Sequence, residues 1–232
     1  MPASTKHDEQ DFLTILSGVF GLIKESWEAF LRNLLTFILL FALPVIAIIL
    51  VVIIVVGIVT FSIGGGAGFS RASIIYIASL LLLVLAISVS FLPAVTITQL
   101  ASVRKKKINP IQAFIKGLPF VFKYLLLGLL VVFSVLAGFI LLVIPGMLLG
   151  FFFSMSFYIL IDKKVGVIEA LKQSFNLVKQ NWMLVLCLYI VNMAISAVNY
   201  LPFVGWAISL GLSIAYFCLP ALIYIKIANK KP

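Results

Sequence analysis

The stretch Leu34–Ser62 reads LLTFILLFALPVIAIILVVIIVVGIVTFS and contains no charged residue. A helix needs about 20 consecutive apolar residues to cross the hydrocarbon core of a bilayer, so this stretch predicts a transmembrane helix with length to spare. Three further apolar regions follow along the chain, at residues 74–101, 118–161 and 182–225. The sequence therefore predicts an all-α, polytopic membrane protein.

The two longest apolar regions each have room for two spans. Pro145-Gly146 lies in the middle of the first and predicts a break there, because Gly and Pro interrupt regular structure. Pro202 and Gly205 mark a similar break in the second region. We therefore expect six transmembrane helices arranged as three hairpins, with helices kinked at Pro44, Pro93 and Pro220.

The composition excludes several classes of protein. Hydrophobic residues make up 64% of the chain and charged residues 10%. Soluble domains average about 45–50% and about 25%, so a water-soluble enzyme, a disordered chain and a disulfide scaffold are all excluded. The net charge is +10, and of the 17 basic residues only Arg71 lies on the side of the membrane opposite both termini. The positive-inside rule accounts for this charge without a nucleic-acid partner and places both termini in the cytoplasm.

Three segments before the first, third and fifth spans have a different, amphipathic pattern. In residues 166–181, Val167, Leu171 and Val178 follow a helical period, with Lys and Gln on the other face. Residues 22–34 repeat this pattern, and residues 110–117 form a shorter version. We expect each segment to be an interfacial helix on the cytoplasmic surface.

These segments also align with one another and predict an internal repeat. Ile23–Trp27 matches Leu171–Phe175, and Ala113 aligns with Ala170. Each repeat unit would be an interfacial helix followed by a membrane hairpin, which gives a pseudo-threefold architecture. The predicted organisation is a polar cytoplasmic tail (1–12), one membrane domain (13–228; units 13–103, 108–162 and 166–228) and a basic cytoplasmic tail (229–232).

One motif resembles a known family. Ile144-Pro145-Gly146 is followed by an aromatic-rich span that ends at Asp162, and then by the sequence GVIEALKQSFNLVKQNW at residues 166–182. This pattern resembles the membrane domain fused to some bacterial glycerophosphodiester phosphodiesterases, and its stand-alone six-span relatives in the bacterial cytoplasmic membrane. The resemblance implies a six-span membrane fold and a location in the bacterial cytoplasmic membrane. It implies no hydrolase activity, because the sequence contains no phosphodiesterase domain. The motif positions are Pro145, Gly146, Asp162, Gly166, Glu169, Ala170, Ser174 and Asn181.

Groups that could support catalysis are scarce. No Asp or Glu lies between Glu28 and Asp162 or after Glu169, and His7 is the only histidine. An intramembrane aspartyl protease, a His-based metal motif and a Ser–His dyad therefore cannot be built within the spans. We expect no enzyme activity, no metal and no cofactor.

Three groups of residues remain as candidate sites, each with a structural alternative. The basic residues either bind anionic lipid or a partner or only set topology. Asn192 and Asn199 either line a polar cavity or bond helix to helix. Asp162 and Glu169 either bind a head group or cation or stabilise a helix N-terminus. The candidate lipid or partner contacts are Arg104, Lys105, Lys106, Lys107, Lys163, Lys164, Lys172 and Lys179.

The sequence thus favours a non-enzymatic, multi-pass protein of the bacterial cytoplasmic membrane. We expect an accessory or scaffold role, in which the interfacial helices bind membrane lipids or a partner membrane protein. A small carrier or exporter of an uncharged or lipid-like substrate is the alternative, because six spans with buried Asn and Gln need no intramembrane carboxylate for such a substrate.

Overall fold

A computed structural model describes residues 18, 21–64, 71–198 and 205–229, and every regular element in these ranges is a helix. The all-α fold class is therefore confirmed. A first helical segment covers residues 21–32. The elements that follow are α2 (Leu34–Gly64), α3 (Arg71–Val103), α4 (Pro110–Gly117), the short 3-10 helix η1 (Leu118–Phe120), α5 (Val121–Leu141), α6 (Val143–Phe153), α7 (Ser156–Asp162), α8 (Val167–Gln180), α9 (Trp182–Val198), α10 (Gly205–Tyr216) and α11 (Leu219–Ala228).

Several of these helices are long and apolar enough to cross a membrane. By length and composition, four stretches of the described residues qualify, and a fifth is added if the bent pair α8 and α9 counts as one span. The predicted second span lies within α3, of which Ser90–Val103 qualifies only as a shorter apolar helix. The helices therefore indicate a multi-pass membrane protein, while six spans stay a prediction. The four stretches are Leu34–Thr60, Pro110–Leu141, Val143–Asp162 and Gly211–Ala228.

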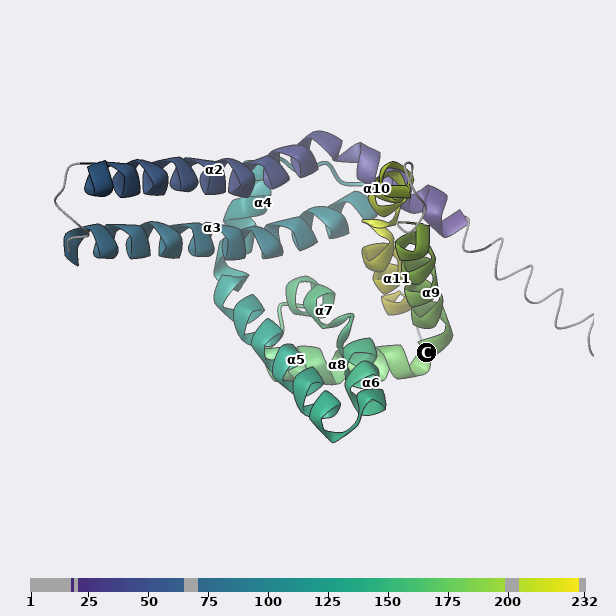
Figure 1. Cartoon of the computed structure of the whole chain (residues 1–232). Helices are drawn as coiled ribbons and strands as arrows, with labels where there is room; N and C mark the ends of the chain where they lie inside the picture. The colour runs from purple at the N-terminus through teal and green to yellow at the C-terminus, as the bar shows by residue number, and fades with distance from the viewer. Residues whose placement is uncertain (1–17, 19–20, 65–70, 199–204, 230–232) are drawn as a thin grey trace, which may run out of the picture.

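Helices that are neighbours in the sequence pack against each other in pairs. In Figure 1, α2 and α3 run side by side as a long pair, and α5 and α6 form a second pair that also packs together. The largest cluster of buried apolar side chains lies where α3, α7, α8, α9 and α11 meet. Leu160, Val178, Val185 and Tyr224 are completely buried in it, so this junction is the core of the described molecule.

The three segments predicted to be interfacial are helical. The structure has α4 at the predicted residues 110–117 and α8 within one residue of the predicted 166–181. The helix α8 meets α9 at an angle of 93°, so it does not continue the direction of the apolar helix that follows it. Their position at a membrane surface stays a prediction.

A small residue on each of these segments packs closely against another part of the chain. The hydroxyl of Ser26 donates to the carbonyl of Ala215 at 2.6 Å, and that of Ser174 donates to the carbonyl of Phe152 at 2.7 Å. A Cβ on Gly117 would lie 3.0 Å from the backbone nitrogen of Ala94. These three positions are the ones that the predicted repeat aligns. They share a mode of packing, and the repeat itself stays a prediction.

The break between α5 and α6 lies before the residues that the sequence indicated. Leu142 is extended, with φ −168° and ψ 146°, whereas Pro145 and Gly146 belong to the first turns of α6. Proline fits there because the first turn of a helix needs no bond from its backbone N–H. Gly146 instead allows α5 and α6 to approach closely, since a Cβ on Gly138 would lie 2.7 Å from the Cα of Gly146.

Pro220 also has a different role from the kink predicted for it. The helix α10 ends at Tyr216, and Pro220 is in the first turn of the separate helix α11. It therefore begins a helix, again at a position where the missing N–H is not needed. Pro44 and Pro93 lie inside α2 and α3 as predicted. The predicted break at Pro202 lies outside the described residues, and α10 begins at Gly205.

Candidate functional site

The basic loop after α3 is built on a left-handed lysine. Lys105 has φ 58°, a backbone conformation that residues other than glycine seldom adopt. The N–H of Lys106 bonds to the carbonyl of Ala101 at 2.8 Å, and that of Lys105 bonds to Ser102 at 3.1 Å. This pair of bonds is the Schellman motif, which satisfies the last carbonyls of a helix and turns the chain sharply. Because of this turn, the side chain of Lys105 points in a different direction from the side chains of its basic neighbours.

The side chain of Asn33 holds this loop in place. Its amide donates to Lys106 O at 2.9 Å and to the hydroxyl of Ser102 at 2.8 Å, and its oxygen accepts the N–H of Ile108 at 3.1 Å. Thr36 Oγ1 donates to Ile108 O at 2.6 Å. Asn33 is only 4% exposed, so these bonds replace water at a buried junction.

The loop after α3 is joined to the end of α7 by an ion pair. Arg104 Nη2 lies 2.5 Å from Asp162 Oδ1, and the hydroxyl of Tyr224 donates to Asp162 Oδ2 at 3.0 Å. Asp162 is the last residue of α7, where the helix dipole disfavours a carboxylate. Asp162 also lies five residues before α8 begins at Val167, and the alternative that it stabilises that N-terminus stays a prediction. Its charge is balanced by Arg104, and its side chain is 16% exposed.

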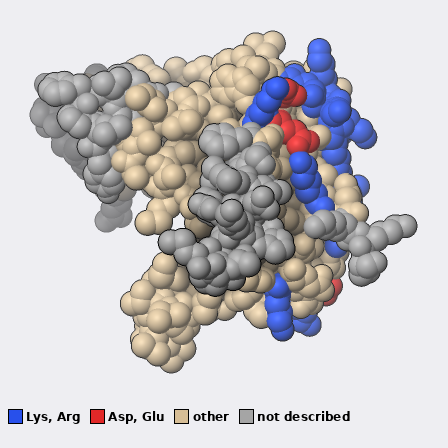
Figure 2. Space-filling model, turned by 90° about the vertical axis from the view of Figure 1, so that its right-hand side faces the viewer, with Lys and Arg blue, Asp and Glu red and all other residues tan. Residues whose placement is uncertain are grey.

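These elements enclose a basic pocket of about 550 Å³, which we call the basic pocket. Its lining also includes apolar side chains, among them Ile97, Phe120 and Ile161. Lysine and arginine side chains also gather along one edge of the molecule in Figure 2. The lining of the basic pocket therefore combines five cations, one carboxylate and apolar side chains. The charged and polar residues of the basic pocket are Arg104, Lys106, Lys107, Gln112, Lys116, Asp162 and Lys164.

The structure divides the basic residues that the sequence grouped together. Lys105 turns away to a small pocket that also contains Glu25, Glu28 and Arg32. Lys163 donates to Gln173 at 2.8 Å.

The remaining two lysines of that group belong to α8. Lys172 lies beside a groove lined by Ile168 and Phe175, and Lys179 is exposed in the last turn. Only Arg104, Lys106, Lys107 and Lys164 of the predicted contacts reach the basic pocket, where Lys116 joins them.

The other motif positions have structural contacts around α8. Gly166 is its N-cap residue, Ala170 is completely buried, and Asn181 bonds to Leu177 O at 3.2 Å. Glu169 lies in the first turn, as expected, and accepts a bond from Gln173 at 2.8 Å. These residues begin α8, pack it and orient it. For the positions that the structure describes, packing therefore accounts for the motif.

A second cavity of about 510 Å³, which we call the polar cavity, lies among α3, α7 and α9. Gln99 Nε2 donates to Phe217 O at 3.0 Å, and Tyr158 donates to Gln99 Oε1 at 3.1 Å. None of the described residues that line this cavity is charged. Its polar lining residues are Thr96, Gln99, Tyr124, Ser154, Tyr158, Tyr189, Asn192 and Tyr216.

Asn192 is an exposed residue of α9 and is among those that line the polar cavity, and the two alternatives for it stay predictions. Its side-chain amide makes no hydrogen bond to the described residues, although its backbone carbonyl accepts one from Ser196 at 2.9 Å. Asn199, the second residue of that prediction, lies outside the described residues. The tyrosines of the cavity were missed, because tyrosine in an apolar run gives no sign of which cavity it faces.

Metal ligands do not gather in the described part of the chain, where no three His, Cys, Asp or Glu side chains come together. Cys187 and Cys218 are both free thiols there.

The comparisons with known proteins find one match. The model of a family described as an uncharacterised protein family, UPF0259, matches residues 69–208, more than half of the chain. No curated protein and no solved structure matches it. The matched residues include α3 to α9 and therefore most of the basic pocket and the polar cavity.

Proposed function

We propose that this chain, which belongs to the uncharacterised protein family UPF0259, is a non-enzymatic membrane protein that binds anionic lipid in the basic pocket. The observation that supports this function is that five cations line one pocket together with apolar side chains. Lysine and arginine side chains near a membrane surface each contribute about 1 kcal/mol to the binding of anionic lipid.

The shape of the basic pocket supports a lipid over a soluble anion. Ile97, Leu100 and Phe120 line the same pocket as the cations, and such apolar side chains suit the first carbons of an acyl chain. Arg104 is already paired with Asp162, so the free cations are the lysines. A phosphate head group would add a second partner to Arg104 without breaking that pair, because a guanidinium has five N–H donors.

The setting of this function follows the sequence. We place the protein in the bacterial cytoplasmic membrane as three hairpins with both termini in the cytoplasm, as the charge distribution and the resemblance to phosphodiesterase-linked membrane domains favour. The basic pocket then faces the anionic inner leaflet. A scaffold role follows if lipid held there, or the exposed face of α8, contacts a partner membrane protein.

The test compares two pairs of lysines that carry the same charge. Lys116→Gln with Lys164→Gln removes two cations from the basic pocket, whereas Lys172→Gln with Lys179→Gln removes two from the exposed face of α8. Binding of phosphatidylglycerol to the purified chain in phosphatidylcholine nanodiscs is measured by native mass spectrometry. The pocket variant should bind about tenfold or more weakly and the α8 variant nearly normally.

Equal losses in the two variants would indicate diffuse attraction to the surface and would contradict the pocket. Accessibility of an added N-terminal cysteine from each side of the vesicle checks that neither variant inverts the protein, because lysines also set topology.

The polar cavity supports a second candidate function, a carrier for an uncharged or lipid-like substrate. Asn192, Gln99 and Thr96 all line it, and the side-chain amide of Asn192 makes no hydrogen bond to the described residues. Efflux of an uncharged fluorescent lipid from vesicles containing the protein, compared with Asn192→Leu vesicles, tests this function. Identical rates with and without protein would exclude it.

A further inference from the structure

We propose that an apolar groove between α2 and α10 is a lateral opening through which the hydrocarbon chain of an uncharged amphiphile enters, with its polar end in the polar cavity. The groove has a volume of about 560 Å³ and is lined by Phe30, Phe37, Ile38, Phe41, Ala42, Val45, Ser213, Ile214 and Phe217. The inference uses the cavity of the second candidate function, but it requires binding only and no transport.

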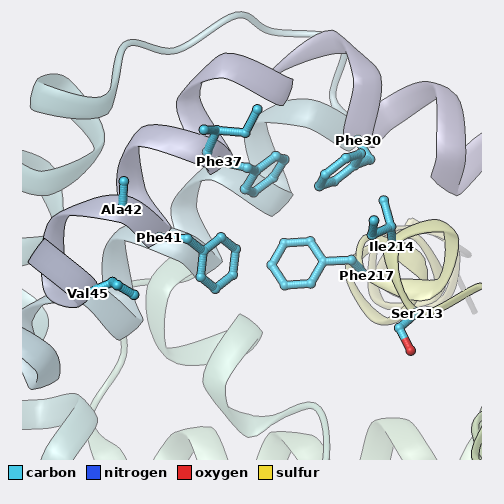
Figure 3. A pocket seen from close by; sticks show the side chains of 9 residues that line it. Phe30, Phe37, Phe41, Ala42, Val45, Ser213, Ile214 and Phe217 are labelled. Atoms are coloured by element: carbon cyan, nitrogen blue, oxygen red, sulfur yellow. The ribbon is translucent and has the colours of Figure 1, made fainter. Parts of the chain in front are cut away.

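The groove and the cavity share a wall of two phenylalanines. Phe41 and Phe217 line both, and their ring centroids are 5.6 Å apart at an interplanar angle of 63°. Figure 3 shows the two rings pointing toward each other, Phe41 from α2 and Phe217 from the turn before α11. Because Phe41 and Phe217 line both spaces, rotation of these two rings is the step that joins the groove to the cavity in this proposal.

The backbone at Phe217 is fixed while its ring is not bonded to a polar group. Gln99, which lines the polar cavity, donates to the Phe217 carbonyl at 3.0 Å. The ring contacts other rings, with Phe37 5.2 Å away edge to face. Each such ring contact is weak by itself, so the ring can turn when the hydrocarbon chain of the ligand replaces these contacts.

The linings specify the ligand. Neither the groove nor the polar cavity has a charged residue, so an ionised head group would be buried without a partner, which is strongly unfavourable. The groove offers only Ser213 as a polar side chain and suits a hydrocarbon chain. The cavity offers the free amide of Asn192 and several hydroxyls for a hydroxyl or ester group. A monoacylglycerol or a long-chain alcohol has this chemistry, whereas anionic lipid belongs to the basic pocket.

The experiment uses photo-crosslinking of the full chain in phosphatidylcholine nanodiscs. The probe is a monoacylglycerol with a diazirine on its chain, and labelled peptides are identified by mass spectrometry. We expect labels on residues of the groove and protection by unlabelled monoacylglycerol. Labels spread evenly over the exposed apolar faces of α2, α5 and α9 would overturn the proposal.

Matched variants then test the opening itself. Ala42→Trp should fill the groove and remove most of the labelling, while Leu39→Trp, on an exposed part of α2 outside the groove, should not. Phe217→Ala should raise the rate at which cavity residues are labelled, because one ring of the wall is gone. Unchanged labelling in Ala42→Trp would overturn the proposal, provided that both tryptophan variants melt near the parent temperature.

The outcomes separate this inference from the two functions above. A phosphatidylglycerol probe that labels the groove as well as the monoacylglycerol does would contradict the selectivity for an uncharged head. Groove labelling that survives Lys116→Gln with Lys164→Gln is the expected result, since the basic pocket is a different site. Groove labelling without efflux would contradict the carrier and leave the binding site supported.

Discussion

The amide of Asn33 and the backbone carbonyl of Lys106 lie 2.9 Å apart and join the start of the first apolar helix to the basic loop. The same side chain also accepts the N–H of Ile108 at 3.1 Å. A residue at the beginning of α2 therefore fixes the path of the lysines that line the basic pocket. The shape of that pocket depends on this uncharged amide as well as on the cations themselves.

Asn33→Ala should both destabilise the protein and weaken lipid binding. The substitution leaves the buried N–H of Ile108 and the hydroxyl of Ser102 without Asn33, which costs about 1–3 kcal/mol of folding free energy. Thermal unfolding in detergent and phosphatidylglycerol binding measure the two effects. Asn181→Ala is the control, because the Asn181 side chain bonds among the described residues only to Leu177 O, one turn away, and its loss should change both quantities far less.

Asp162→Asn should increase the affinity of the basic pocket for anionic lipid. The asparagine oxygen can still accept a bond from Arg104, and its NH2 can donate to the Tyr224 hydroxyl, but the one negative charge among the described residues of the pocket is removed. A gain of about 1 kcal/mol corresponds to about fivefold tighter binding. Glu169→Gln is the matched control, because its carboxylate bonds to Gln173 on α8, outside the pocket. Weaker binding in Asp162→Asn would mean that the carboxylate serves to position Arg104.

The sequence predicted the helical segments better than the places where helices break. The period of α8 and the position of Pro110 located α8 and α4 to within a residue. The break at Leu142 had no such signal, because it lies in an unbroken run of apolar residues. It is located by the close approach of Gly138 and Gly146, which is a tertiary contact.

The sequence predicted which kinds of residue form the candidate site, but not how those residues are arranged in space. The basic residues were identified as a group, yet the left-handed turn at Lys105 sends that residue away from its neighbours. Tyr224 lies 62 residues from its partner Asp162, so no local pattern could have paired them. This pairing depends on how α7 and α11 meet, and the spacing of residues in the sequence gives no information about that.

Gly138→Ala should separate α5 from α6 and lower the stability. The new Cβ would lie 2.7 Å from the Cα of Gly146, and backbone on both sides would have to move. Overpacking of this kind costs about 1–3 kcal/mol. In Gly150→Ala the nearest atom is at an ordinary 3.8 Å, so that variant should be neutral or slightly more stable. Thermal unfolding in detergent compares the two, and equal melting temperatures would contradict the close contact.

Ser174→Ala should weaken the attachment of α8 to the end of α6. The Ser174 hydroxyl is completely buried and donates to Phe152 O at 2.7 Å, and such a bond contributes about 0.5–1.5 kcal/mol. Ser196→Ala removes a bond of similar length, 2.9 Å, that lies within α9 and is exposed. The first variant should therefore melt at a lower temperature than the second. Hydrogen exchange localises the effect: α8 should exchange faster in Ser174→Ala, whereas unchanged protection there would mean that apolar contacts alone hold the helix.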